Sequence, residues 1–319
     1  MNTKYNLDFA ENSIDAVVLA GKSKLIVKNK PNIIHFSSPL FSLYPPASYS
    51  LINSPEPMDK ADIDYKAIIK IDGKPMVNYV MEALAESFYT KNIYVVGEED
   101  LLNKVDIQRG KEKIKFVDDK GSFVDNLVEG GNKAKSKKII YSTCDIPLIT
   151  SKDIDNFIKG CSNRSDGDFY LVYYLKEDYE KNFPEVKSGK FYQLSEKSIK
   201  NGCIFMLDRD FLDDINKNKD MRNIIAFLYS GRKKGLWPYI KLIPKCLSFA
   251  SLRLLIKYKH RTLTIDEAEK ILSGIIKHNI VAIKSSSQVG MDADSYEELQ
   301  NIEKIIKNNK SYIKSENIL

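Results

Sequence analysis

The stretch SIDAVVLAGKSK, residues 13–24, decides the fold of this chain. Its apolar and β-branched run at 16–20 predicts a short buried strand. Ala-Gly and two lysines follow, which predicts a strand-to-helix turn whose backbone N–H groups can bind a phosphate. The glycine spacing of a Walker loop is absent. Taken alone, the stretch is equally compatible with an ordinary turn between a strand and a helix.

Strand patterns alternate with helix patterns along the rest of the chain. Strands are expected at 92–97, 113–117, 137–143, 168–175, 201–207 and 280–285. Helices are expected at 74–87, 151–159, about 265–277 and from 296 onward. This alternation predicts an α/β fold in which helices cover both faces of a mostly parallel sheet. Ligands of such sheets lie beyond the carboxyl ends of the strands.

The expected helix ends have recognisable signals. Capping boxes are predicted at Thr150 with Asp153, at Thr264 with Glu267 and at Ser295 with Glu298. Pro75 suits the first turn of the helix at 74–87, since its missing N–H would have no partner there. Gly160 is expected to end the helix at 151–159.

Two regions interrupt the alternation. Residues 22–65 contain six of the eleven prolines, which predicts a long surface insertion rich in Pro, Ser and Tyr. Residues 208–279 have mostly helical patterns and precede the last expected strand. We therefore expect one domain over residues 1–319 with two insertions.

Composition indicates which class of protein this is and which residues could hold a metal. The chain has 319 residues, 43% of them apolar, so it can bury a full core. No apolar run is long enough to span a membrane, and the polar stretch at 1–12 does not resemble a signal peptide. Four scattered cysteines suit a reducing, cytoplasmic location. With only three histidines and no cysteine pair, any metal is expected to be held by carboxylates.

Positive charge is concentrated in one segment. Residues 232–261 contain nine Lys or Arg, no Asp or Glu, and the only tryptophan, although the whole chain has a net charge of only +6. Basic residues mixed with aromatic and apolar ones suit peripheral contact with an anionic membrane. They also suit a phosphorylated acceptor, or an amphipathic helical subdomain with a solvated basic face. No nucleic-acid-binding motif is present, so nucleic acid is not expected as a partner.

Three polar features are expected at the carboxyl ends of strands, and therefore on one rim of the sheet. They are Gly21 with Lys22 and Lys24, then Asp145 in IIYSTCDIPLIT (139–150), and the loop within VGMDADSYEELQNIEKI (289–305). A fourth segment, YKAIIKIDGKPMVNYVMEAL (65–84), follows the first insertion. The order of these segments resembles the nucleotidyltransferase superfamily that includes molybdenum-cofactor guanylyltransferase.

The resemblance implies a Rossmann-like, three-layer α/β/α fold with a glycosyltransferase-A-like mixed sheet. Its members transfer a nucleoside monophosphate from a nucleoside triphosphate to an acceptor and release pyrophosphate. It implies that Lys66 contacts phosphates and that Asp145 and Asp292 bind catalytic Mg²⁺. Asp294 is the alternative second ligand, or a helper at the N-terminus of the last helix.

Further residues carry over from the same resemblance. The nucleotide is expected to contact Leu19, Ala20 and Gly21, and Gly121, Ser122 and Asn126 of DKGSFVDNLVEGG (119–131). For Asn126 the alternative to nucleotide contact is a structural role. The acceptor is expected to lie near Asn201 and Gly202 of NGCIFML (201–207).

The first loop departs from the family pattern L-A-G-G-x-G-x-R-M. Lys22 replaces the second glycine, and the arginine that clamps the triphosphate is missing. Lys22, Lys24 or a residue of the basic segment would then have to neutralise the phosphates. Two functions follow: metal-dependent nucleotidyl transfer to a phosphorylated small molecule, or a degenerate protein that binds a nucleotide or nucleotide-sugar without turnover. A glycosyltransferase would normally have Asp-x-Asp where this chain has CDIP.

Overall fold

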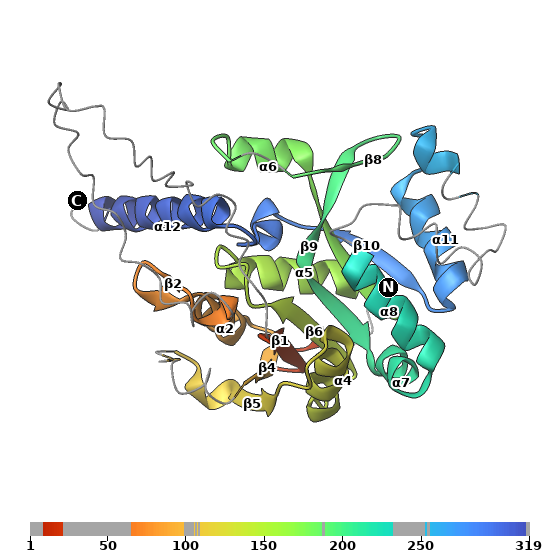
Figure 1. Cartoon of the computed structure of the whole chain (residues 1–319), viewed down its shortest axis with the longest axis horizontal. Coiled ribbons are helices and arrows are strands. Elements are labelled where there is room, and N and C mark those ends of the chain that lie inside the picture. Colours follow the sequence, from red (N-terminus) through yellow and green to blue (C-terminus); the bar gives the residue numbers. More distant parts are fainter. Residues whose placement is uncertain are drawn as a thin grey trace, which may run out of the picture.

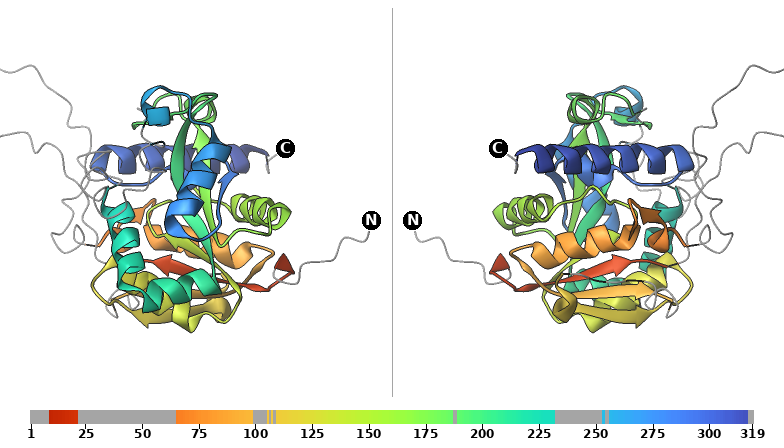
Figure 2. Two further views of the ribbon diagram at one scale, coloured as in Figure 1. Left: turned by 90° about the vertical axis from the view of Figure 1, so that its right-hand side faces the viewer. Right: turned by 90° about the vertical axis from the view of Figure 1, so that its left-hand side faces the viewer.

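The computed structural model describes residues 9–21, 65–98, 105, 107, 109–186, 189–231, 253 and 256–316, and the structural statements below concern these residues. A central mixed sheet has the strand order β10-β7-β9-β6-β1-β4-β5, with β8 paired to β9. Helices cover both of its faces (Figures 1 and 2). The predicted α/β class and the mixed, glycosyltransferase-A-like sheet are therefore confirmed.

The strands follow the predicted order along the chain. Those of the central sheet are β1 (Ile14–Leu19), β4 (Thr90–Gly97), β5 (Ile114–Asp118), β6 (Lys138–Thr143), β7 (Phe169–Leu175), β8 (Tyr192–Gln193), β9 (Ser198–Asp208) and β10 (Ile280–Lys284). A separate antiparallel pair consists of β2 (Lys70–Ile71) and β3 (Lys74–Pro75).

Strand direction places the polar features on one rim. β1 is parallel to β4 and β6, β4 is parallel to β5, and β10 is parallel to β7. β9 lies between β6 and β7 and is antiparallel to both. As a result β9 begins at the rim where its neighbours end.

The helices form the two outer layers. They are α2 (Met76–Glu86), α4 (Phe123–Lys133), α5 (Ser151–Asn163), α6 (Lys176–Asn182), α7 (Arg209–Lys217), α8 (Lys219–Gly231), α11 (Ile265–Ile276) and α12 (Tyr296–Glu316). Short 3-10 turns cover Lys66–Ile68, Lys111–Lys113 and Ser287–Gly290.

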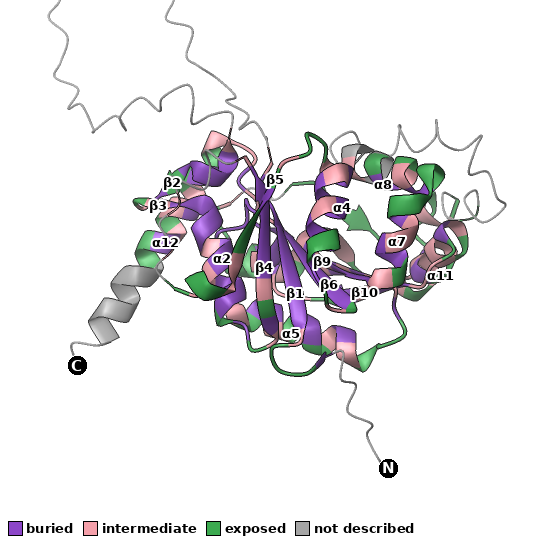
Figure 3. Cartoon of the chain, turned by 90° about the horizontal axis from the view of Figure 1, so that it is seen from below, coloured by how far each residue is buried: buried purple, intermediate pink, exposed green. Residues whose placement is uncertain are grey.

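The alternation of side chains along β1 creates two cores. Ala16 and Val18 face a core shared with α2, α5 and α12, whereas Val17 and Leu19 face a core shared with α4, α7, α8 and α11. Every residue of β1 is buried, and Figure 3 accordingly shows this strand in purple. A strand buried on both faces has a nearly continuous apolar sequence, as the run at 16–20 predicted, and β1 departs from this at the buried Asp15.

Local signals fix most helix starts, with one correction. Thr150 and Thr264 form the predicted capping boxes, and Pro75 directly precedes α2. The expectation that Gly160 ends its helix is wrong, because α5 continues to Asn163. A Cβ on Gly160 would lie 2.6 Å from Cγ2 of Ile283 in β10. Gly160 therefore permits close packing of helix against strand.

The two insertions are described only in part. Residues 22–64 and 232–252 lie outside the described residues, so the Pro-rich insertion and most of the basic segment 232–261 are untested. The described part of 208–279 is mainly helical and contains α7, α8 and α11. The single-domain organisation stays a prediction. Within the described ranges, no helix is both long and apolar enough to cross a membrane.

Candidate active site

The site lies where the carboxyl end of β6 meets the loop after β10. The backbone N–H of Ala293 donates to the carbonyl of Asp145, with an N–O distance of 2.9 Å. This bond fixes the loop at 291–294 beside the residues that follow β6. Segments almost 150 residues apart in sequence thus meet on one rim, as the positions of their strands predicted.

Lys66 connects these two segments through its ammonium group. Its Nζ lies 3.3 Å from Oδ2 of Asp145 and also forms an ion pair with Oδ1 of Asp294. The Lys66 side chain is only 2% exposed. Burial alone would lower the pKa of Lys66, but the charges and hydrogen bonds of the two aspartates outweigh burial and raise it. Lys66 is therefore a buried cation at neutral pH.

The 3-10 turn that carries Lys66 is fixed by its neighbours in sequence. The N–H of Ile69 donates to the carbonyl of Lys66, and the carbonyl of Ile69 accepts from Met76 at the start of α2. Ala67 and Ile69 are buried in the core shared with α2. The apolar residues around Lys66 thus hold its backbone while its side chain reaches the carboxylates.

The loop after β10 uses its two aspartates differently. Asp294 pairs with Lys66, and its backbone N–H donates to Glu298 at the start of α12, at 3.0 Å. Asp292 has no hydrogen bond or ion pair to any described residue. Burial first, and then the charge of Asp145, raise the pKa of Asp292 to about 6.

The two candidate metal ligands have unused oxygen atoms. Oδ1 of Asp145 is buried and has no hydrogen-bond partner in the described part of the chain. The repulsion between Asp145 and Asp292 would be relieved by a cation between them. The described residues contain no group of three or more His, Cys, Asp or Glu side chains suited to a metal. Two carboxylates fit Mg²⁺, which commonly uses one or two carboxylates together with substrate phosphates.

The raised pKa of Asp292 predicts the effect of replacing it by Asn. A carboxyl whose pKa is raised on folding stabilises the fold below its unfolded pKa of 3.8, and this contribution is lost as the pH rises through about 6. At pH 7.5 without metal, we expect Asp292→Asn to increase the free energy of unfolding by about 1–2 kcal/mol. The full shift would give about 3 kcal/mol, which the partial exposure of Asp292 reduces.

Urea unfolding with a chelator present, at pH 7.5 and at pH 4, measures this gain. At pH 4 the wild-type carboxyl is protonated in the folded state, so the gain should largely disappear. A variant that is destabilised at pH 7.5, or equally stabilised at both pH values, would contradict this account of Asp292.

The first loop packs closely against the loop after β5. A Cβ on Gly21 would lie 2.7 Å from Nδ2 of Asn126 and 3.0 Å from Oδ2 of Asp119. Asn126 donates to Asp119 Oδ1 at 2.7 Å, and its own Oδ1 accepts from the N–H of Lys120 at 2.7 Å. The Asn126 amide therefore supports this loop, which favours the structural alternative for that residue. Lys22 and Lys24 lie outside the described residues.

The remaining nucleotide-site candidates flank this contact. Leu19 and Ala20 are buried, and the N–H of Ala20 donates to the carbonyl of Val96 at 2.8 Å. Gly121 has a φ of +82°, a conformation that favours glycine, and Ser122 caps the N-terminus of α4. The structure thus brings the expected residues of 19–21 and 121–126 to one place, and their contact with a nucleotide stays a prediction.

The start of β9 approaches the same rim, as expected for Asn201 and Gly202. A Cβ on Gly202 would lie 2.6 Å from Cγ1 of Val172 and 2.8 Å from Cγ2 of Val289. Gly202 therefore lets the turn at Ser287–Gly290 pack onto the sheet. Asn201 is exposed and pairs with Tyr173 of β7.

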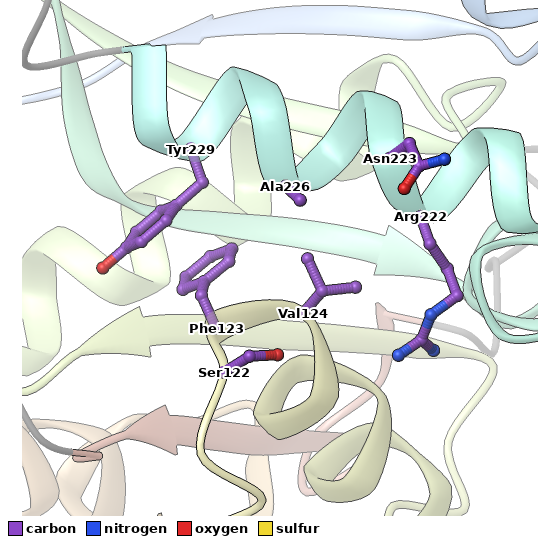
Figure 4. A pocket seen from close by; sticks show the side chains of 7 residues that line it. All are labelled: Ser122, Phe123, Val124, Arg222, Asn223, Ala226 and Tyr229. Atoms are coloured by element: carbon purple, nitrogen blue, oxygen red, sulfur yellow. The ribbon is translucent and has the colours of Figure 1, made fainter.

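Two features near the site have no signal in the sequence. Lys200, beside Asn201, lowers the pKa of Asp292 by its charge. A cleft of about 370 Å³ lies between the start of α4 and the face of α8 (Figure 4). At its ends Phe123 stacks on Tyr229, with ring centroids 3.6 Å apart, and Arg222 pairs with Asp125. No family motif covers α8, so the sequence could not predict this cleft.

Comparison with known proteins agrees with this geometry. The family described as the MobA-like NTP transferase domain matches residues 60–217. No protein of curated function matches the sequence. A hypothetical transferase from Thermus thermophilus has a similar structure, with a TM-score of 0.59 at 18% identity over 90% of this chain and 99% of that one. This likeness supports the fold.

Two further solved structures are less similar. A CMP:2-keto-3-deoxy-manno-octonic acid synthetase in complex with CTP has a TM-score of 0.49 at 14% identity, over 92% of this chain and 99% of that one. A 4-diphosphocytidyl-2C-methyl-D-erythritol synthase from Anaerococcus prevotii has a TM-score of 0.48 at 10% identity, over 94% of this chain and 98% of that one.

The range that matches the family includes both Lys66 and Asp145. Residues 60–217 belong to the MobA-like NTP transferase domain family, a family of transferases.

Proposed function

We propose that this protein is a metal-dependent nucleotidyltransferase. It moves a nucleoside monophosphate from a nucleoside triphosphate to a phosphorylated small molecule and releases pyrophosphate. One observation carries the proposal: Asp145 and Asp294 form an ion network around the buried Lys66 at the strand ends, and near Asp292 a buried oxygen of Asp145 has no hydrogen-bond partner among the described residues. A cation next to carboxylates with free oxygens is suited to a metal–polyphosphate ligand.

The side chains of the site supply charge and position. Asp145 and Asp292 would hold Mg²⁺, which neutralises phosphate charge when bound. Lys66, held by two carboxylates, places a fixed positive charge where negative charge develops on the phosphoryl oxygens. The N–H groups beside Gly21 and at the N-terminus of α4 can bind further phosphate oxygens.

The reaction needs no nucleophilic side chain. An acceptor oxygen forms a new bond to the α-phosphorus while the bond between that phosphorus and the bridging oxygen to the β-phosphate breaks. Pyrophosphate leaves with the bonding electron pair, and Lys66 helps to neutralise the charge that develops. Catalysis of this kind depends on positioning and electrostatic stabilisation.

The setting of the reaction is also part of the proposal. We place the protein in the cytoplasm, where nucleoside triphosphates and Mg²⁺ are available. The cations of the segment 232–261 would attract an anionic acceptor, or an anionic membrane surface from which the acceptor is taken. Binding of the acceptor and binding of the membrane surface would both depend on the attraction between these cations and phosphate groups.

Thermal stability tests the donor part of the proposal. Purified protein is heated with ATP, GTP, CTP or UTP, each with Mg²⁺ and with chelator. We expect one triphosphate to raise the melting temperature by about 2–4 °C at about 100 times its Kd, and only with Mg²⁺. Stabilisation without metal would contradict metal dependence. The absence of any shift would contradict nucleotidyl transfer and favour the degenerate, nucleotide-sugar-binding alternative.

A further inference from the structure

Lys200 occupies a distinctive place at the rim. It lies near the start of β9, which runs against its neighbours, so it lies at the edge where the other strands end. In the strand register it lies opposite Tyr174 of β7, and Tyr174 donates to the carbonyl of Gly290 at 3.3 Å. The cross-strand neighbour of Lys200 is therefore hydrogen-bonded to the turn that leads into Asp292.

The alternation of side chains fixes the face on which Lys200 lies. The Cβ direction of Gly202 points at Val289, with distances of 2.8 Å to its Cγ2 and 3.0 Å to its carbonyl oxygen. Residues two apart on a strand share a face, so Lys200 lies on the same face as Gly202, and Asn201 lies on the opposite one. Lys200, rather than Asn201, thus lies on the same face of the sheet as the turn before Asp292, and its Nζ lies 3.4 Å from where a Cβ on Gly189 would be.

The charge around Asp292 is unbalanced without Lys200. Asp145, Asp294 and Glu298 place negative charge around Asp292, and Lys200 is the basic residue whose charge acts on Asp292 in the opposite direction. Lys66 is already engaged by two carboxylates. Lys200 is half-buried, and its ammonium makes no ion pair or hydrogen bond with any described residue. It is therefore a cation near the proposed metal carboxylates that remains available to a ligand.

We propose that Lys200 binds the anionic phosphate group of the acceptor. This inference rests on the proposed function and assigns the recognition of the acceptor's phosphate to one residue. A lysine ammonium binds phosphate as a point charge with three donors. With metal on Asp145 and Asp292, a phosphate beside Lys200 would be held next to the reacting centre.

The test uses inorganic phosphate as the probe. Phosphate is titrated by calorimetry into the full-length protein with Mg²⁺, first alone and then with the α,β-methylene analogue of the stabilising triphosphate bound. We expect Lys200→Met to weaken phosphate binding at least tenfold in the presence of the analogue. Lys200→Arg should retain binding within about threefold, because the positive charge is kept. Lys217→Met, which removes an exposed lysine on α7, should change nothing.

The outcomes separate this inference from the proposed function. Unchanged phosphate binding in Lys200→Met, or no phosphate binding to the wild type, would overturn the role of Lys200. Equal loss of analogue binding in Lys200→Met would place Lys200 in the donor site and would also overturn it. If no triphosphate binds but phosphate binding still depends on Lys200, the proposed nucleotidyl transfer fails while the phosphate site stands. Melting curves of both Lys200 variants confirm that each is folded.

Discussion

Replacing Lys66 by Met is expected to lower the free energy of unfolding by about 3 kcal/mol, because it leaves two carboxylates in a buried site without their cation. Met has nearly the same length and fills the space, so packing changes little. Asp145 and Asp294 lose the partner that their side chains share. Triphosphate binding should fall in the same variant, since the fixed charge at the phosphates is gone.

Urea unfolding measures this loss. Adding Mg²⁺ and varying the pH test whether the loss comes from the missing charge of Lys66. Mg²⁺ should restore part of the stability of Lys66→Met, since a divalent cation can neutralise the same carboxylates. The raised pKa of Lys66 means that its contribution is present below the unfolded pKa of 10.5 and is lost only as the pH rises beyond the folded value. The difference between wild type and variant should therefore be constant from pH 7 to pH 9.

The matched control is Lys217→Met, which removes an exposed lysine whose one ion-pair partner among the described residues is Asp213 on the same helix. Such pairs contribute little to stability. A loss in Lys66→Met below about 1 kcal/mol, or one as small as in the control, would show that the ion network is not a buried cation site.

The position of Asp145 could be predicted from the sequence. An apolar strand followed by Asp-x-Pro places the aspartate at a strand end, where ligands of α/β sheets bind. The predicted capping box of Ser295 and Glu298 likewise placed Asp292 and Asp294 just before a helix. In the structure half of this box forms: Glu298 donates its N–H to the Ser295 hydroxyl at 3.3 Å, whereas its carboxylate accepts from the N–H of Asp294 rather than of Ser295. These features depend on short stretches of chain, which is why local patterns were sufficient.

Other features depend on contacts that no local pattern contains. Gly160 has the sequence signal of a helix end but lies within α5. Glycine is required there because the side chain of Ile283, in a distant strand, packs where a Cβ of residue 160 would lie. The pairing of Lys66 with Asp294 depends on how a 3-10 turn packs beside the last loop. Lys200 looks like any lysine on a strand until the antiparallel direction of β9 brings it to the rim. Sequence patterns could not have singled out these residues for such roles.

Replacing Asp145 by Asn is expected to abolish magnesium-dependent nucleotide binding and to leave the fold intact. The amide is nearly isosteric, and the bond from Ala293 to the backbone carbonyl at position 145 remains. Lys66 keeps Asp294 as a partner. Oδ1 of Asp145, which has no hydrogen-bond partner among the described residues, however belongs to a carboxylate, and the substitution removes the negative charge that Mg²⁺ prefers in its oxygen ligands.

The measurement that tests the central claim most directly is a calorimetric titration of the stabilising triphosphate into wild type, Asp145→Asn and Asp213→Asn, with and without Mg²⁺. Asp213→Asn is the control, because Asp213 lies on α7 and, within the described part of the chain, forms an ion pair with Lys217 alone. We predict that Mg²⁺-dependent affinity falls at least a hundredfold in Asp145→Asn, about 2.7 kcal/mol, and stays unchanged in the control. Equal affinity in wild type and Asp145→Asn would contradict a metal site at Asp145, and with it the proposed mechanism.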